Sequence, residues 1–219
     1  MSTKLVLGYD FTIELSRRRV SMIIEEEWFK DHDMSKLVKG AVVPRPIAWV
    51  STVSRDGIRN LAPFSFFTVA SMDPITLCIS IGRVEREKDT LVNIRDTGDF
   101  VINIVSESLA NQMHISSKSY GREEDEFFKA GTRGEESVKV TAPRAANAPI
   151  SFECKLDKII EVGSSDLILG KVVCYHIKDD LLIPGEKVDP YKLSPVGRMA
   201  GNYSFIREFY RLPNSNLPK

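Results

Sequence analysis

The most constraining feature of this chain is a pair of apolar runs that flank a short turn near residue 55. The runs cover residues 47–53 and 60–70, and the turn between them reads Ser54-Arg55-Asp56-Gly57. Asp-Gly tolerates the positive φ angles of tight hairpin turns, so the segment predicts an antiparallel β-hairpin. Other runs rich in β-branched and aromatic residues predict further strands at 75–81, 100–105, 152–162 and 167–177.

Helical patterns are fewer, at residues 25–40, 88–97 and 107–115. Many strands with tight turns and few helices favour a mainly β fold, an antiparallel barrel rather than a parallel α/β sheet. Residues 1–21 read as an N-terminal extension, and residues 22–219 as a single domain.

Two segments lack a clear periodic pattern. Residues 116–136 are polar and charged around an apolar pair, Phe127-Phe128, and predict a long loop that is functional or mobile. Residues 178–203 are rich in proline, glycine and aspartate and predict an irregular tail that wraps over the barrel or over a partner subunit.

The overall charge balance excludes several classes of partner. The chain has 30 Lys and Arg against 30 Asp and Glu, so bulk charge gives no reason to expect nucleic acid or an anionic membrane. Any anion site must therefore be built locally. No apolar run approaches the ~20 residues of a membrane span, and the N-terminus lacks a secretory core, which predicts a cytoplasmic protein.

The cysteines and histidines show no ligand spacing. The three cysteines lie in apolar, strand-like runs without a C-x-x-C pair, and they read as small buried thiols in a reducing compartment. The three histidines are scattered along the chain, so no metal site is predicted. These six residues are Cys78, Cys154, Cys174, His32, His114 and His176.

A candidate anion site lies at the start of the helix predicted over 88–97. Lys88-Asp89-Thr90 opens this helix, Asp89 or Thr90 can cap it, and Asn93 lies one turn further on. Arg83 precedes the helix by a few residues. Cations, hydroxyls and backbone N–H groups at a helix start suit a phosphate. The alternative is a solvated charge cluster, because Arg83–Lys88 is nearly self-neutralising.

The neighbouring hairpin offers a place for a flat aromatic cofactor. Pro63 cannot donate to a β-ladder, so the strand is irregular there and leaves backbone groups for a ligand such as an isoalloxazine ring. Ala62, Phe66 and Trp49 could supply flat apolar walls, although core packing is the alternative role for each aromatic side chain. Neither G-x-G-x-x-G nor G-x-x-x-x-G-K-[ST] occurs, and neither does G-x-S-x-G. The sequence therefore gives no support to a Rossmann nicotinamide domain or to hydrolase chemistry. If the protein is an enzyme, a bound cofactor supplies the chemistry.

Several motifs in order resemble the flavin reductase-like FMN-binding split-barrel family. That family includes flavoredoxin and the flavin reductase component of nitrilotriacetate monooxygenase. The likeness covers about residues 35–205. Its motifs are VVPRPIAWVSTVSRDGIRNLAPFSFF, REKDTLVNIRDTGDFVINIV, SLANQMHIS, APISFECKLDKIIEVG, Asp179-Asp180 and VDPYKLSPVGRMAGNYS.

The resemblance implies an antiparallel, Greek-key-like split β-barrel that forms a homodimer and binds FMN near the subunit interface. The positions matching the family's flavin site on the hairpin are Trp49, Ser51, Thr52, Asn60, Ala62, Ser65 and Phe66. Those matching its phosphate and ribityl site are Ser80, Arg83, Lys88, Thr90 and Asn93. Arg198 and Tyr203 would complete the site from either subunit. The resemblance assigns no catalytic acid or base.

The implied activity is an NAD(P)H-dependent flavin reductase. NADH or NADPH, as a transient co-substrate, would give a hydride to flavin N5, and the electrons would pass to free flavin or to a partner oxygenase. The alternative is a non-catalytic, flavoredoxin-like electron carrier that a ferredoxin-type donor reduces. A third reading is a haem or pyridoxal phosphate site, for which neither His114 nor His176 has a supporting pattern.

Overall fold

The structure is a computed structural model that describes residues 3–7, 11–15, 23–83, 86–210 and 212. The chain divides into two compact units, Met1–Lys39 and Gly40–Lys219, which are described separately. This division does not test the predicted boundary after residue 21, which stays a prediction.

The first unit holds a strand pair and short helical turns. Strands β1 (Thr3–Leu7) and β2 (Phe11–Leu15) pair antiparallel. One helix was expected over 25–40, and that prediction is wrong: α1 (Glu26–Phe29) and α2 (Ser35–Ala41) are separate. The break comes at Asp33, whose carboxylate accepts hydrogen bonds from the Ser35 N–H (2.8 Å) and hydroxyl (2.9 Å). Such a cap starts a new helix rather than continuing the old one.

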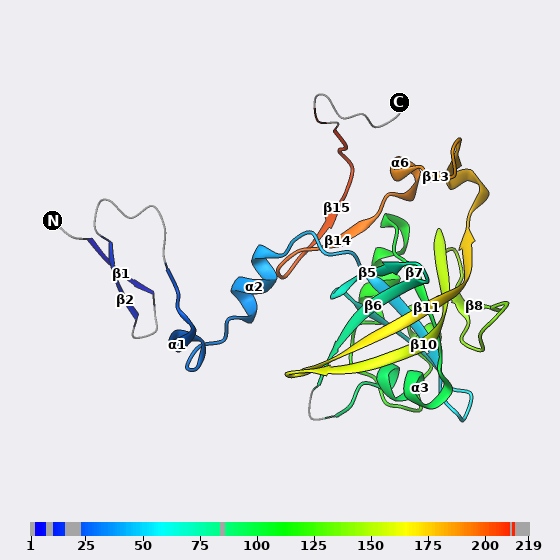
Figure 1. The fold of residues 1–219 in the computed structure, drawn as a ribbon, viewed down its shortest axis with the longest axis horizontal. Coiled ribbons are helices and arrows are strands. Elements are labelled where there is room, and N and C mark those ends of the chain that lie inside the picture. The colour runs from blue at the N-terminus through cyan, green and yellow to red at the C-terminus, as the bar shows by residue number, and fades with distance from the viewer. Residues whose placement is uncertain (1–2, 8–10, 16–22, 84–85, 211, 213–219) are drawn as a thin grey trace. The chain divides into compact units, whose positions relative to one another are not determined.

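The second unit is built on a seven-stranded antiparallel sheet in the order β4-β3-β7-β10-β11-β6-β5 (Figure 1). Five of the six predicted strands are confirmed. The strands are β3 (Ala48–Val53), β4 (Arg59–Phe64), β5 (Phe67–Met72), β6 (Ile75–Gly82), β7 (Asp99–Ile104), β10 (Ile150–Val162) and β11 (Ser165–Ile177).

The sheet closes because its two edges are joined by a very short link. β4 and β5 lie at opposite ends of the strand order, yet residues 65–66 alone connect them. Two residues span only about 7 Å, so the sheet must curl until its edges meet. The single strand predicted over 60–70 is therefore wrong, since it crosses this seam. β4 pairs with β3 and β5 pairs with β6, which leaves a barrel that is split at the seam.

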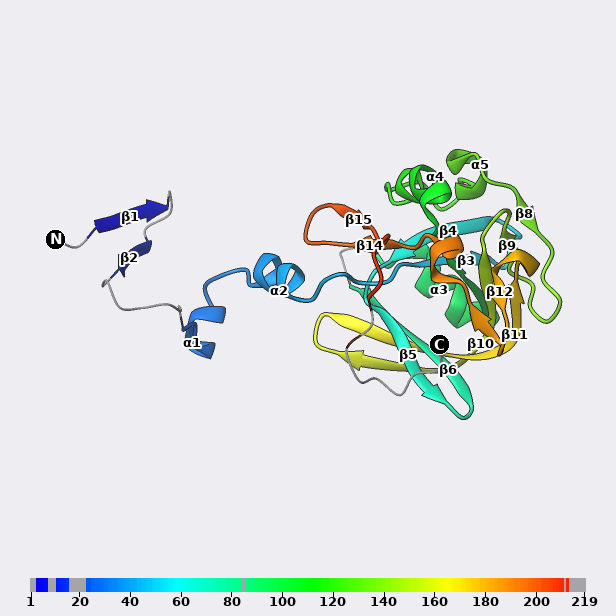
Figure 2. The ribbon, with the colours of Figure 1, turned by 90° about the horizontal axis from the view of Figure 1, so that it is seen from above.

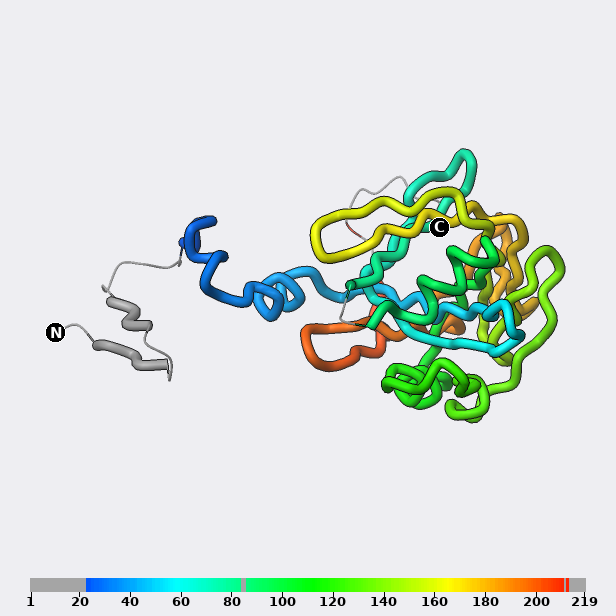
Figure 3. Tube along the Cα trace, turned by 90° about the horizontal axis from the view of Figure 1, so that it is seen from below, coloured from blue at the N-terminus to red at the C-terminus, as the bar shows by residue number. Residues whose placement is uncertain are grey.

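Strands β10 and β11 form one long hairpin, drawn in yellow in Figure 3. Its register shifts between Glu153 and Cys154 and again between Leu156 and Lys158. Bulges of this kind bend a strand and re-aim its side chains. They allow the hairpin to pair with β7 on one side and with β6 on the other as the sheet curls.

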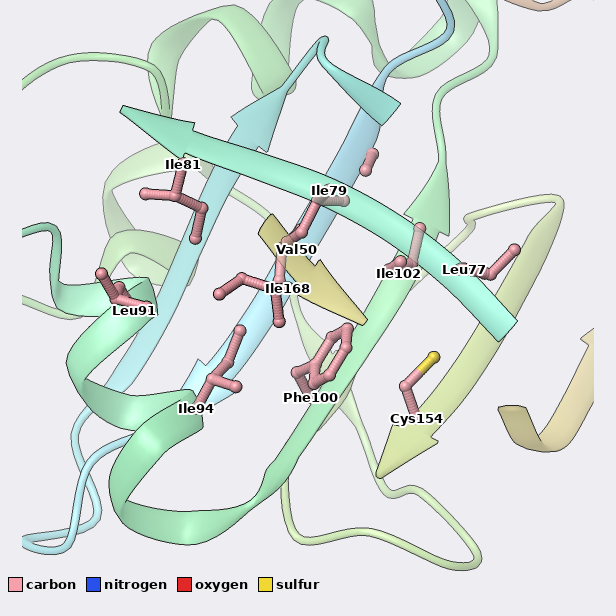
Figure 4. Packing of buried hydrophobic residues seen from close by; sticks show 11 residues of the cluster. Val50, Leu77, Ile79, Ile81, Leu91, Ile94, Phe100, Ile102, Cys154 and Ile168 are labelled. Carbon is pink, nitrogen blue, oxygen red and sulfur yellow. The ribbon is translucent and has the colours of Figure 1, made fainter. Parts of the chain in front are cut away.

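The barrel interior is filled by aliphatic side chains and Phe100, over which α3 (Asp89–Thr97) packs (Figure 4). Leu91 and Ile94 are the apolar face of this helix and are fully buried. The helix ends as predicted at Gly98, whose φ of 72° is the left-handed conformation that glycine adopts without strain. Gly170 is required opposite Phe100, because a Cβ there would lie 2.2 Å from the ring.

A second core cluster lies around Trp49, beneath short helices that cover β4. These are the turn Glu107–Leu109, α4 (Ala110–Ile115) and α5 (Glu126–Ala130), with α4 and α5 side by side in Figure 2. The long loop predicted over 116–136 is therefore wrong at α5. Asp125 accepts from the N–H groups of Phe127 (2.9 Å) and Phe128 (3.2 Å), and Phe127 is fully buried.

The tail contains more regular structure than predicted. Its last two strands are tied to the barrel, because Arg45 and Arg198 exchange backbone hydrogen bonds of 3.0 and 2.8 Å. Among the described residues, no helix is long and apolar enough to cross a membrane. The remaining elements are β8 (Gly134–Glu135), β9 (Arg144–Ala145), a 3-10 turn (Asp179–Leu181), β12 (Leu182–Ile183), β13 (Lys187–Val188), α6 (Pro190–Leu193), β14 (Val196–Arg198) and β15 (Tyr203–Phe205).

Candidate functional site

A cavity of about 430 Å³ lies beside the N-terminus of α3, and we refer to it as the α3 cavity. Three segments form its walls: β4, the entry to α3, and the chain that follows α4. A volume of this size is typical of small-molecule sites. Its lining residues are Asn60, Ala62, Pro63, Phe64, Gly82, Arg86, Glu87, Lys88, Asp89, Thr90, Ser116, Ser117, Lys118, Ser119, Tyr120 and Glu126.

Four of the residues predicted for the site form one buried hydrogen-bond network. Asn60 Oδ1 accepts from the hydroxyls of Thr90 (2.7 Å) and Thr52 (3.3 Å). Asn93 Nδ2 donates to Thr52 Oγ1 (3.0 Å). The network joins β3, β4 and α3. Its hydrogen bonds offset the free-energy cost of removing these polar groups from water. It therefore fixes the N-terminus of α3 against the hairpin, which is the wall of the cavity.

Glu126 from α5 completes this network. Its Oε2 accepts from Asn60 Nδ2 (2.6 Å) and from the Leu61 N–H (2.5 Å). Burial, with a smaller contribution from the nearby Asp89 carboxylate, raises the pKa of Glu126 to about 7 against the opposing effects of the Leu61 N–H, Lys88 and the Asn60 amide. The cavity thus has a carboxyl group that changes charge near neutral pH.

The cations around the cavity differ in how they are engaged. Asp89 accepts from Arg86 (2.7 Å) and from Arg122 (2.9 Å), so its negative charge at the helix start is offset. Lys88 lines the cavity and makes no ion pair with any residue that the structure describes. A free ammonium group beside a helix N-terminus is a favourable place for an anion.

A second, smaller cavity of about 270 Å³ adjoins the first, and we refer to it as the Arg198 cavity. Pro63 and Ser117 line both cavities, and Ser65 lines the second. The guanidinium of Arg198 lies 4.5 Å from the centre of the Tyr203 ring. The structure therefore places the tail residues Arg198 and Tyr203 beside the hairpin, and their role in the site stays a prediction.

Three further predicted residues, Trp49, Ser51 and Arg83, use the polar groups of their side chains in hydrogen bonds within the protein. Trp49 is fully buried and its indole N–H donates to Ser116 Oγ (2.8 Å). The hydroxyl of Ser51 donates to the Pro143 carbonyl (2.5 Å). Arg83 binds the Asp166 carboxylate through two hydrogen bonds of 2.9 and 2.6 Å and does not line the α3 cavity.

Ser80 and Phe66 lie at the barrel seam, where the Ser80 N–H donates to the Phe66 carbonyl (2.8 Å). The structure thus brings Asn60, Ala62, Lys88 and Thr90 to the α3 cavity, with Thr52 and Asn93 behind them and Ser65 in the adjoining cavity. The flavin-binding roles of all twelve residues stay predictions.

Sequence reasoning missed three contributors to the cavity: Glu126, Arg86 and the segment Ser116–Tyr120. Asp125 as a helix cap and Gly131 as a helix end were the available signals for α5. Nothing local shows that this helix brings Glu126 to Asn60, because the two residues are 66 positions apart.

The curled sheet, its open seam and the adjoining cavity define a split-barrel domain. The chain belongs to the flavin reductase like domain family, because the sequence model of that family matches residues 40–190. The resemblance and the split-barrel fold inferred from the sequence are thereby confirmed. Membership supports flavin-dependent oxidoreductase chemistry as the general class of activity.

Individual relatives agree with this assignment. A protein of Aquifex aeolicus is 44% identical over 176 residues, which are 80% of this chain and 89% of that protein. Nitrilotriacetate monooxygenase component B from Bacillus cereus has a TM-score of 0.85 and 29% identity, over 89% of this chain and 100% of that one. The 2-nitrobenzoate 2-nitroreductase NbaA of Pseudomonas fluorescens has a TM-score of 0.80 and 31% identity, over 90% and 99%.

Proposed function

We propose that this protein binds FMN and acts as an NAD(P)H-dependent flavin reductase, which supplies free flavin or a partner flavin-dependent oxygenase with electrons. The main support is the α3 cavity, where Lys88 lies beside a helix N-terminus in a domain of the flavin reductase like family. The likeness to a component of nitrilotriacetate monooxygenase supports an oxygenase as the partner.

The residues of the α3 cavity fit a phosphorylated, hydroxylated ligand. Lys88 and the first N–H groups of α3 suit a phosphate, as cations and helix starts do in general. Asn60 and Glu126 place polar atoms on the adjacent wall, which suits sugar hydroxyls. Ala62 and Phe64 give β4 an apolar surface for a flat ring.

When bound, FMN supplies the two-electron chemistry, with NADH or NADPH as its proposed co-substrate. The Arg198 cavity is the proposed approach for that co-substrate, because it adjoins the α3 cavity through Pro63 and Ser117. Arg198 would pair there with an anionic group of the nicotinamide. Glu126 would hold a proton on its carboxyl group near neutral pH and thereby limit negative charge beside the phosphate.

The homodimer is also part of the proposal. Val69, Met72 and Ile75, from the β5–β6 hairpin, are 54%, 74% and 45% exposed. A second copy of the chain would cover such apolar surface. Sedimentation equilibrium would test this by giving the mass of one chain or of two. The cytoplasmic location stays a prediction.

An anaerobic visible spectrum of the purified protein, before and after NADH and NADPH, tests the reductase. We expect flavin absorption bands that bleach with one nicotinamide. Bands that persist with both nicotinamides, but bleach with reduced ferredoxin, would replace the reductase with a flavoredoxin-like electron carrier. A protein that shows no bands even after FMN is added would contradict the assignment of the cavity.

A further inference from the structure

Apart from the α3 cavity, the structure gathers three metal-binding side chains at one end of the β10–β11 hairpin. They are Glu153 from β10 and Cys174 and His176 from β11. One carboxylate oxygen, one sulfur and one imidazole nitrogen lie within 4.8 Å of one another. None of the three lines the α3 cavity or the Arg198 cavity.

We propose that Glu153, Cys174 and His176 form a binding site for a divalent cation of the zinc class. Zn²⁺ takes carboxylate oxygen, thiolate sulfur and imidazole nitrogen as ligands, whereas Mg²⁺ and Ca²⁺ prefer oxygen alone. A thiolate and a carboxylate together would neutralise the two charges of the cation.

The strand register explains why these three side chains meet. Glu153 lies opposite Cys174, and His176 is two residues further along the same strand. Side chains two residues apart share a face of a strand, and directly opposed residues are neighbours on that face. The register shift after Glu153 matches Cys154 with Val172, so Val173 is the extra residue of a bulge next to the cluster.

Glu153 is held in place before any cation arrives. Its side chain is fully buried, and its two oxygens accept from the backbone N–H groups of Val138 (2.8 Å) and Lys139 (2.6 Å). Ligating carboxylates in proteins are commonly oriented by such additional hydrogen bonds. The carboxylate is therefore a preorganised ligand that ties the segment at 138–139 to the hairpin.

Two of the three distances between ligand atoms come close to those of a tetrahedral ion, and the third, from Cys174 Sγ to the Glu153 carboxylate, is within 4.8 Å. Zinc–ligand bonds of about 2.0–2.3 Å place neighbouring ligand atoms roughly 3.3–3.7 Å apart. Cys174 Sγ and His176 Nε2 are already 3.4 Å apart, while His176 Nε2 and Glu153 Oε1 are 2.5 Å apart. The imidazole is 22% exposed and can open this contact by about 1 Å, the distance that separates 2.5 Å from the tetrahedral range.

A fourth ligand can reach the site from solvent. His176 lines a surface cavity of about 400 Å³ together with Arg144 and Lys178. Both cations have partners of their own, Arg144 at Glu135 and Lys178 at the Asn147 carbonyl. A water molecule in this cavity would complete four-coordination. On binding, the ion takes the place of any proton between Nε2 and Oε1, which moves to Nδ1 of a neutral imidazole or leaves to solvent from a protonated one, and the thiol proton leaves to solvent.

Zinc titration of the chelator-treated whole protein against a chromophoric competitor tests the proposal. We expect one Zn²⁺ per chain and an affinity that falls about 100-fold or more in Cys174→Ser and in His176→Gln. Matched controls are Cys78→Ser, a half-buried cysteine on β6, and His114→Gln, an exposed histidine on α4. These controls should bind zinc like the parent protein. Equal zinc affinity in the parent, C174S and H176Q would overturn the site.

Cobalt spectroscopy of the unmodified protein provides a second readout that does not depend on folding of a variant. We expect the visible bands of tetrahedral Co²⁺ and a near-ultraviolet sulfur-to-cobalt charge-transfer band, both displaced by zinc. A cobalt spectrum without sulfur charge transfer would overturn the participation of Cys174. Neither readout involves flavin, so the result is independent of the proposed reductase activity.

Discussion

Glu126 and Glu153 are both buried carboxyl groups in the second unit, and their surroundings affect them in opposite directions. At Glu126, burial raises the pKa to about 7, and one backbone N–H and one amide only partly offset it. At Glu153, burial also favours the neutral acid, but two backbone N–H groups and His176 outweigh it, so the pKa is lowered. The donors around a buried carboxyl, and not burial alone, decide its charge.

The contrast indicates different roles for the two residues. Glu126 borders the α3 cavity and can lose its proton near neutral pH without leaving its partners. Glu153, whose pKa is lowered, carries a negative charge at neutral pH and fastens a loop to the β10–β11 hairpin. The four predictions that follow test this contrast in order of decreasing effect.

Removing the Glu153 carboxylate should have the larger effect on stability. We expect Glu153→Ala to lower the free energy of unfolding by about 3–5 kcal/mol, because it leaves buried N–H groups and His176 without an acceptor. Glu126→Ala should lower the free energy of unfolding by about 1–3 kcal/mol. The loss is smaller because water from the α3 cavity can reach the Asn60 and Leu61 donors that the carboxylate leaves unpaired. Urea unfolding measures both. Glu161→Ala, at a side chain that is 77% exposed, is the control. Equal losses of unfolding free energy in E126A and E153A would show that the two carboxyl groups do not differ in their contribution to stability.

The raised pKa of Glu126 should make stability depend on pH. The folded protein retains this proton up to about pH 7, whereas the unfolded chain loses it near pH 4.5. The folded state binds more protons between these values, so stability falls as pH rises through that window and is constant outside it. We expect the difference in unfolding free energy between parent and Glu126→Gln to fall by roughly 3 kcal/mol from pH 4.5 to pH 7. A pH-independent difference would mean that Glu126 titrates normally.

Lys88, which lines the α3 cavity together with Glu126, should contribute more to FMN binding than Arg83. Lys88→Ala should weaken FMN binding by about 1.5–3 kcal/mol, the range of a charge-assisted hydrogen bond. Arg83→Ala should change the affinity little, because Asp166 already binds its guanidinium. Quenching of FMN fluorescence on titration measures both. A larger loss in R83A than in K88A would place the phosphate near β6 instead.

Asp125 positions Glu126 by capping α5. We expect Asp125→Ala to lower the unfolding free energy by about 1 kcal/mol, the usual cost of losing a helix N-cap. Asp125→Asn retains a capping oxygen and loses the charge that pairs with Arg59, so it separates the two contributions. Thermal unfolding followed by circular dichroism would distinguish them. Stability in D125A equal to that of the parent would show that α5 is held by Phe127 packing alone.

Sequence patterns correctly predicted the elements that depend on local interactions. The Asp56-Gly57 turn and the Gly98 helix end both occur where positive φ angles were expected, at 82° and 72°. The helix starting near Lys88 and the two arms of β10–β11 followed from apolar periodicity and β-branched content. The prediction of a single strand over 60–70 was wrong, because no local signal at Ser65–Phe66 shows that the chain passes there from one edge of the sheet to the other.

The same division holds for the candidate site. Lys88 and Thr90 could be placed together from the sequence, because they are neighbours at a helix start. The pairing of Arg83 with Asp166 could not, since it depends on β6 lying beside β11. The cluster of Glu153, Cys174 and His176 likewise has no spacing that a motif could describe, because strand register creates it.

The sequence by itself determined the turns, the helix starts and ends, most of the strands, and the family to which the chain belongs. The turns, helix ends and strands depend on backbone preferences and side-chain periodicity over a few residues, whereas the family followed from the resemblance of motifs spread over about residues 35–205. Tertiary structure alone decided the closure of the barrel at residues 65–66, the arrival of Glu126 at the α3 cavity, and the opposite pKa shifts of the two buried glutamates. These depend on which remote segments pair, and a carboxyl group acquires its donors only when that pairing is complete.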